Sequence, residues 1–206
     1  MTPSVAGRLH RARRAAGAAH GFTVIELLIS MVMIGIVVGP LASMLTVVNR
    51  TSNVTMNQDA YLTEARAAVE TIVGNVRQAY TSSAAMPAIV SMSGTQLTFY
   101  SPDTRQPFHL VELSYQLTGG MLKRSVATST NTGGPPWTIP ALGAATTLVG
   151  SVTNSTIFAY QDANGAVTAD PTKVSRVLVT VTITPPGGGP ATTYQDSGTI
   201  RAAVSG

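Results

Sequence analysis

The stretch that decides the fold reads Gly21-Phe22-Thr23-Val24-Ile25-Glu26-Leu27-Leu28 and continues as ISMVMIGIVVGPLASMLTVV to Val48. Every residue from Leu27 to Val48 is uncharged. As an α-helix this run would span roughly 33 Å, which matches the roughly 30 Å of a bilayer core. The sequence therefore predicts a membrane helix over residues 22–48 that begins beside a carboxylate.

A basic segment, residues 1–21, precedes this helix. It contains no Asp or Glu, and it holds four of the 13 Lys and Arg residues of the chain: Arg8, Arg11, Arg13 and Arg14. The remaining 9 basic residues are balanced by 9 acidic ones, so the formal net charge of +4 belongs to this segment. No basic patch remains to hold a phosphate backbone, and no direct nucleic-acid partner is predicted. The arginines predict a cytoplasmic N-terminus and export of everything after Val48.

Other kinds of N-terminal segment account less well for Glu26. A secretory signal peptide has a shorter apolar region and a small-residue cleavage site at its far end. A twin-arginine signal at Arg13-Arg14 and a plain signal anchor are further alternatives. A carboxylate inside a membrane helix costs about 2.5–3.5 kcal/mol when it is central, and such a group normally marks a function. None of the three alternatives supplies one for Glu26.

The segment Gly21 to Leu28 resembles the type IV prepilin motif, Gly-Phe-Thr-x-x-Glu followed by a hydrophobic helix. In that family a membrane peptidase cuts after the Gly and methylates the new amino terminus. The resemblance implies that residues 1–21 are removed by cleavage between Gly21 and Phe22, and that Phe22 is N-methylated. It also implies that Glu26 pairs with the terminal amine of a neighbouring subunit during assembly.

Elementary electrostatics supports that role. Cleavage would create an ammonium group at Phe22, and opposite charges attract strongly in a low-dielectric filament core. Further along the helix, Gly39-Pro40 weakens the backbone, since Pro lacks an N–H and Gly has low helix propensity. We therefore predict a helix bend or melting point at Gly39 and Pro40; a membrane-helix Pro with no assembly role is the alternative.

Beyond the membrane segment, residues 49–83 are predicted to continue the helix in amphipathic form. The pattern runs from Arg50 to about Tyr80. Apolar residues recur at three-and-four spacing, which predicts one buried stripe: Leu62, Ala65, Val69, Ile72, Val73, Val76 and Tyr80.

Residues 84–206 are predicted to form a β-rich globular domain. Six stretches have strand patterns: Gln96–Tyr100, Phe108–Leu117, Leu122–Ala127, Thr156–Gln161, Val174–Thr184 and Thr192–Arg201. Gly119-Gly120 and Asp162–Gly165 read as tight turns, the Gly/Pro-rich stretch Asn131–Gly150 as an ordered loop, and Pro185–Pro190 as a break. Alternation predicts that Val177, Val179, Val181 and Ile183 face the core.

The predicted fold class is α+β and pilin-like, a long N-terminal helix packed on an antiparallel meander. The order of these strands, from Ser114-Tyr115-Gln116-Leu117 through Gly119-Gly120 and on to the strand at Arg176, resembles the minor-pilin branch of PilW-like proteins and J-type pseudopilins. The paired-cysteine loop of the family is missing, because the chain has no Cys.

Catalytic and metal sites find little support. Asp162, Asn164 and Asp170 offer too few oxygens for Ca²⁺, which takes six to eight, and they are ordinary turn formers. His109 is the one His after residue 21 and sits in a strand pattern, so a structural role is expected. Trp137 is either packed on Pro135-Pro136 or exposed to a partner. No catalytic residue, metal ligand or cofactor is predicted.

The sequence thus predicts a minor pilin or pseudopilin that helps to initiate or cap a type IV pilus or a type II secretion-like filament. A major pilin is the alternative, and a signal-anchored binding protein or hydrolase is a more distant one. The expected partners are the prepilin peptidase, other pilin or pseudopilin subunits, the inner-membrane assembly platform and membrane lipid. The chain is expected in the inner membrane as a single-pass protein, and then in a periplasmic or cell-surface filament.

Overall fold

The structure is a computed structural model, and it describes residues 21–81, 87–103, 105, 107–132, 134–186 and 189–200. The chain divides into two compact units that meet between Asn49 and Arg50. Helix α1 (Val24–Arg77) belongs to both units, the first holding its apolar part and the second its amphipathic part together with all strands.

In the first unit the side chains of α1 are exposed along its whole length. Among the described residues, α1 is the one helix long and apolar enough to cross a membrane. The hydroxyl groups in this part are satisfied inside the helix, since Ser30, Ser43 and Thr46 donate to the carbonyl oxygens four residues earlier at 2.8–3.0 Å. Such bonding leaves no hydroxyl unpaired in an apolar medium.

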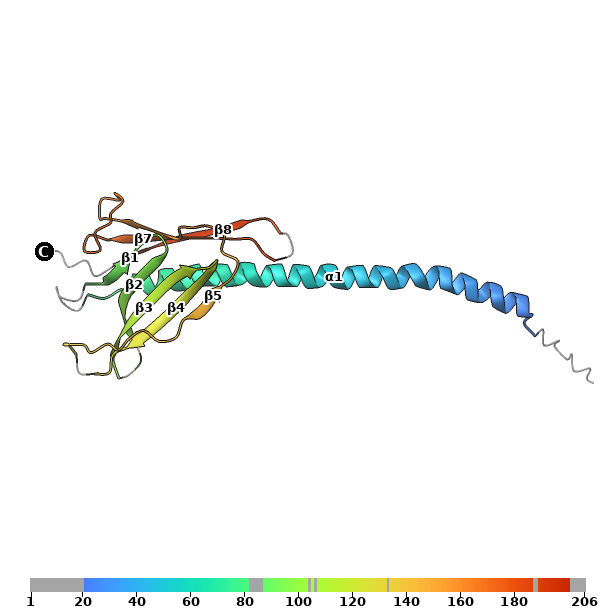
Figure 1. Ribbon diagram of the computed structural model, residues 1–206, viewed down its shortest axis with the longest axis horizontal. Coiled ribbons are helices and arrows are strands. Elements are labelled where there is room, and N and C mark those ends of the chain that lie inside the picture. Colours follow the sequence, from blue (N-terminus) through green and yellow to red (C-terminus); the bar gives the residue numbers. More distant parts are fainter. Residues whose placement is uncertain are drawn as a thin grey trace, which may run out of the picture. The chain divides into compact units, whose positions relative to one another are not determined.

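Two antiparallel sheets form the second unit together with α1 (Figure 1). The five-stranded sheet has the order β1-β2-β3-β4-β5, and its strands are Ile89–Met92, Gln96–Asp103, His109–Thr118, Met121–Thr128 and Thr146–Val149. The three-stranded sheet has the order β6-β7-β8, with strands Phe158–Gln161, Arg176–Ile183 and Thr192–Thr199. The buried side chains of α1 lie in one hydrophobic cluster with residues of both sheets.

The core of this unit is continuous. From α1 it receives Ala65, Ala68, Val69, Ile72, Val73 and Val76, all buried. The four residues predicted to face the core from β7 (Val177, Val179, Val181 and Ile183) are fully buried, which confirms the alternation. Of the predicted stripe, Leu62 is only partly buried, and Tyr80 is 38% exposed because α1 ends at Arg77. There the helix tightens through bonds from Gln78 to Asn75 and from Ala79 to Val76.

The predicted fold class is confirmed, a long helix packed against antiparallel β-structure. All six predicted strands occur, with ends shifted by a few residues. Gly119 and Gly120 have φ of 58° and 70° and join β3 to β4, as the two-residue turn requires. Asp162–Gly165 is also a turn, closed by a bond from Gly165 N–H to Asp162 O at 3.1 Å. The predicted break is confirmed, because Pro185 and Pro190 lie between the end of β7 at Ile183 and the start of β8 at Thr192.

Three features of the prediction are wrong. Strand β1 was not predicted, β5 lies inside the stretch read as a loop, and the strands form two sheets instead of one meander. The two missed strands read IVSM and TTLV, and neither alternates apolar with polar residues. The sheets separate after β5, where Val152 leaves the first sheet and bridges to Ile183 of β7. That long-range contact has no local sequence signal.

Candidate functional site: the N-terminal segment of α1 and the β8 edge

The carboxylate of Glu26 takes part in a capping box at the start of α1. Thr23 is the N-cap residue: its Oγ1 accepts the N–H of Glu26 at 3.2 Å. The carboxylate reaches back, and its Oε2 accepts the N–H of Thr23 at 3.5 Å. These bonds use two of the donors that every helix start leaves unpaired. The carboxylate is thereby directed toward the N-terminal end of the helix.

The long contact at 3.5 Å leaves most of the acceptor capacity of Glu26 available. Glu26 is also the only ionisable side chain between residues 21 and 49, so this segment contains no cationic side chain to neutralise it. In an apolar medium an unpaired carboxylate is strongly penalised. If Glu26 is ionised there, a counter-charge from an amino terminus or from another molecule would stabilise it.

The residues before the capping box are open. Phe22 is 80% exposed, and among the described residues no atom other than those of its chain neighbour lies within 4 Å of the position that a Cβ atom would take at Gly21. Cleavage between Gly21 and Phe22 would leave the capping box intact, since Thr23 and Glu26 both follow the cut. Gly21, Phe22 and Thr23 directly precede α1, and Glu26 lies in its first turn.

The predicted bend at Gly39 and Pro40 lies in a continuous helix. Both residues are helical in this chain, and Ser43 Oγ donates to Gly39 O at 3.0 Å. Pro40 lacks an N–H, so the carbonyl of Ile36 loses its usual helical donor. The backbone is weakest here, and loss of helicity at this point stays a prediction for the packed filament.

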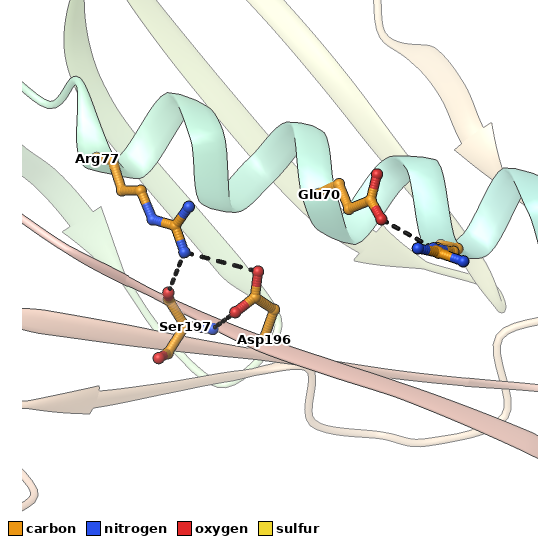
Figure 2. A network of polar contacts seen from close by, with 5 residues as sticks. Glu70, Arg77, Asp196 and Ser197 are labelled. Atoms are coloured by element: carbon orange, nitrogen blue, oxygen red, sulfur yellow. Dashed lines mark hydrogen bonds and ion pairs between the residues drawn. The ribbon is translucent and has the colours of Figure 1, made fainter.

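On the domain, a polar network joins the C-terminal end of α1 to β8 (Figure 2). Arg77 Nη2 donates to Ser197 O at 3.1 Å and lies 3.8 Å from Asp196 Oδ2. The N–H of Ser197 donates to Asp196 Oδ1 at 2.7 Å. The backbone C=O and N–H of Ser197 are thus both bonded by side chains, those of Arg77 and Asp196. Two to three turns earlier on the same helix side, Arg66 pairs with Glu70 at 2.8 Å. The hydrogen bond to Glu70 raises the pKa of the exposed Arg66 guanidinium.

A groove runs between α1 and β8 beside this network. Its wider part, about 410 Å³, is lined by Leu62, Thr63, Arg66, Ala67, Glu70 and Tyr194. A narrower part, about 200 Å³, continues past Gln195 and Asp196. Near the end of β8 the groove closes, because Gly198 lies directly against Val73 and Val76.

The other side chains considered from the sequence have structural surroundings. The Asp162 carboxylate accepts the N–H groups of Asn164 and Ala166, as in an ordinary turn. Hydrogen bonds from Thr172 hold the pKa of the Asp170 carboxyl below its usual range. No group of three metal-ligating side chains forms among the residues that the structure describes.

His109 and Trp137 each have a partner near the start of β3 or at the end of β4. His109 Nδ1 lies 2.9 Å from Ser129 O, at the start of β3. Trp137 is 9% exposed and packs its ring on Phe108, with centroids 5.5 Å apart. Both positions are consistent with structural roles.

Sequence reasoning missed two features of the site. The role of Thr23 had a signal, because Thr-x-x-Glu before an apolar run is the signature of a capping box. The Arg77–Asp196–Ser197 network had none, since its members are more than a hundred residues apart.

Comparison with known proteins agrees with the N-terminal geometry. The family described as the prokaryotic N-terminal methylation motif matches residues 17–42, which include the predicted cleavage position, the capping box and Pro40. No curated protein matches the chain. Together with the long apolar helix and the antiparallel sheets, the match supports a type IV pilin-like protein that is processed by a prepilin peptidase and assembles with other pilin subunits.

Proposed function

We propose that the chain is a subunit of a type IV pilus or a type II secretion-like filament. Residues 1–21 are removed after Gly21, Phe22 is N-methylated, and residues 22–48 span the inner membrane before they pack in the filament core. Residues 49–83 and 84–206 form the exported part, with the uncleaved N-terminus on the cytoplasmic side. The geometry of Glu26 carries this proposal: its carboxylate is directed toward the N-terminus and lacks a cationic side chain in its own segment.

Glu26 would pair with the terminal ammonium group of a neighbouring subunit. The pairing removes the desolvation penalty of two charges at once, so a subunit entering the filament is stabilised only in the register that brings them together. The Thr23 contact holds the carboxylate until that partner arrives.

Two experiments test the proposal. Mass spectrometry of the mature chain is expected to find N-methylated Phe22 as the first residue. An intact Met1, or cleavage beyond Val48, would favour a signal-anchored binding protein or hydrolase instead. The second experiment is Glu26→Ala, with Glu64→Ala on the exported part of α1 as the matched control. Membrane insertion is expected in both variants, and loss from purified filaments only in Glu26→Ala.

The role within the filament divides into two candidates. The neutral domain with long loops, and the resemblance to PilW-like and J-type proteins, favour a minor subunit that initiates or caps assembly. The edge strands β5 and β8, on opposite sides of α1, favour a major subunit that repeats along the filament. The copy number per filament length distinguishes them.

A further inference from the structure

Strand β8 has a free edge that is open over only part of its length. In β7, the backbone N–H of Thr182 donates to Asn154 Oδ1, and its C=O accepts the N–H of Thr153. Both backbone groups of Thr182 therefore point away from β8. Thr182 lies opposite Thr193, so Thr193 and every second residue after it direct their backbone groups away from β7. Those residues are Thr193, Gln195, Ser197 and Thr199.

At Ser197 this edge is closed. Its carbonyl is bonded by Arg77 and its N–H by Asp196, as Figure 2 shows. Thr193 and Gln195 have no such partner within the described part of the chain. Charged side chains on an edge protect it against strand addition, and the stretch Thr192–Gln195, which we call the open stretch, has none.

The five-stranded sheet has two edge strands, β1 and β5. Ser93, which directly follows β1, accepts a hydrogen bond from Tyr160 of β6, so this end of the sheet is joined to the three-stranded sheet, and β5 is the edge on the far side. It bonds β4 on one side, and on its other side no partner is present among the described residues. β5 has four residues, Thr146–Val149, which equals the length of the open stretch on β8. It is uncharged, and Thr146 and Thr147 are exposed. Figure 1 shows β5 and β8 on opposite sides of α1, so the two edges cannot meet within one chain.

The levels of the two strands also fit. β5 ends three residues before Val152, which bridges to Ile183, and Ile183 lies opposite Thr192 at the start of β8. The end of β5 and the start of β8 therefore lie near the same level of the domain. An offset between copies is small if β5 of one copy meets β8 of the next.

We propose that the open β8 edge, Thr192–Gln195, binds strand β5 of a second copy of this chain in the filament. The contact rests on the proposed function, and it is heterologous, so that it repeats along an open assembly instead of closing into a pair. Side chains of the added strand that point toward α1 enter the groove beside Tyr194 and the Arg66–Glu70 pair. The Arg77–Asp196 pair ends the contact at Ser197 and fixes its length.

Cross-linking in assembled filaments tests the contact. The chain contains no Cys, so Thr147→Cys with Gln195→Cys introduces one thiol on each edge in a clean background. A short bifunctional maleimide tolerates a small offset between the strands. Treatment of purified filaments is expected to give a ladder of dimers, trimers and longer products. Thr147→Cys with Ala163→Cys, an exposed turn position, is the matched control and should give no ladder.

Adding Thr193→Pro to the cross-linking pair sharpens the test. The N–H of Thr193 faces away from β7, so Pro removes an edge donor without removing a bond of the ladder. The ladder should fall at least several-fold, while the unfolding midpoint of the detergent-solubilised chain stays close to that of the parent. If the midpoint falls, Thr193→Pro has damaged the fold, and a second variant replaces it. This variant is Gln195→Lys in a chain that carries Thr147→Cys and Thr193→Cys. Its added charge on the edge should give the same loss of cross-linked products.

Three outcomes are decisive. Filaments that contain the double-cysteine chain but give no ladder overturn the edge contact and leave the proposed function standing. If a chain with only Thr147→Cys or only Gln195→Cys gives as much cross-linked product as the double variant, two β5 edges or two β8 edges meet. That result also overturns the contact between β5 and β8. A wild-type chain that never enters filaments overturns the proposed function, and the inference falls with it.

Discussion

Gly198 of β8 lies so close to α1 that a Cβ atom there would stand 2.9 Å from Val76 Cγ1 and 3.0 Å from the backbone oxygen of Val73. Because one of these neighbours is backbone, the helix cannot yield by a rotamer change alone. Gly198→Ala is therefore expected to push β8 away from α1 and to destabilise the chain by about 1–3 kcal/mol, the usual cost of overpacking. Urea unfolding of the full chain in detergent micelles, followed by tryptophan fluorescence, measures the loss.

Gly150→Ala is the matched control, since no atom lies within 4 Å of its Cβ position and its φ is not in the left-handed region. It should be neutral or slightly stabilising, as removal of a Gly restricts the unfolded chain. A Gly198→Ala chain as stable as wild type would mean that β8 does not pack so tightly on the helix.

A second prediction concerns Tyr115, whose hydroxyl accepts a bond from Asn75 Nδ2 at 2.7 Å. Tyr115 is fully buried, so Tyr115→Phe leaves the Asn75 amide without this partner inside the domain. The expected loss of stability is about 1–2 kcal/mol. Tyr80→Phe removes a hydroxyl from a residue that is 38% exposed and should have little effect. Equal midpoints for the two variants would show that the Asn75–Tyr115 bond contributes nothing net.

High pH should unfold the domain through its buried tyrosines. Burial raises the pKa of Tyr160, whose hydroxyl donates to Ser93 O and Gln96 O at 2.9 and 2.8 Å. A tyrosine whose folded pKa lies above the unfolded value of about 10 contributes its full stabilisation below that pH and loses it as the pH rises toward the folded pKa.

The measurement is the urea midpoint at about pH 8 and about pH 11, on either side of the unfolded pKa. Wild type should lose more stability between the two than Tyr160→Phe, although the variant starts from a lower value. A parallel decline of both chains would exclude Tyr160 as a source of the pH dependence.

The sequence predicted the local elements of the fold but not its long-range arrangement. Periodicity found the stripe of α1 and the alternation of β7, because both are local patterns that burial imposes on consecutive residues. It did not find the division into two sheets, since that depends on Val152 meeting Ile183. It also did not find β5, whose four residues follow a Gly/Pro-rich stretch and become a strand through pairing with β4.

The candidate site divides in the same way. Gly21, Phe22 and Glu26 were predicted as one motif, and the structure adds the bond geometry that directs the carboxylate. The open stretch of β8 had no sequence signal, because it depends on which backbone groups the Arg77–Asp196 pair happens to bond.

Thr23 offers the last prediction, because its hydroxyl caps the helix through the N–H of Glu26. Thr23→Val keeps the shape of the side chain but removes the acceptor, and an N-cap loss costs about 1 kcal/mol. The first turn of α1 should then open more often, so amide hydrogen exchange at Glu26 in detergent micelles is expected to be about five-fold faster. Thr23→Ser retains the hydroxyl and should exchange at nearly the wild-type rate. Filament incorporation of Thr23→Val should fall, though less than that of Glu26→Ala, because the carboxylate remains but is held less often toward the incoming amine. Wild-type incorporation together with faster exchange would separate the cap from assembly and limit Thr23 to a helix-stabilising role.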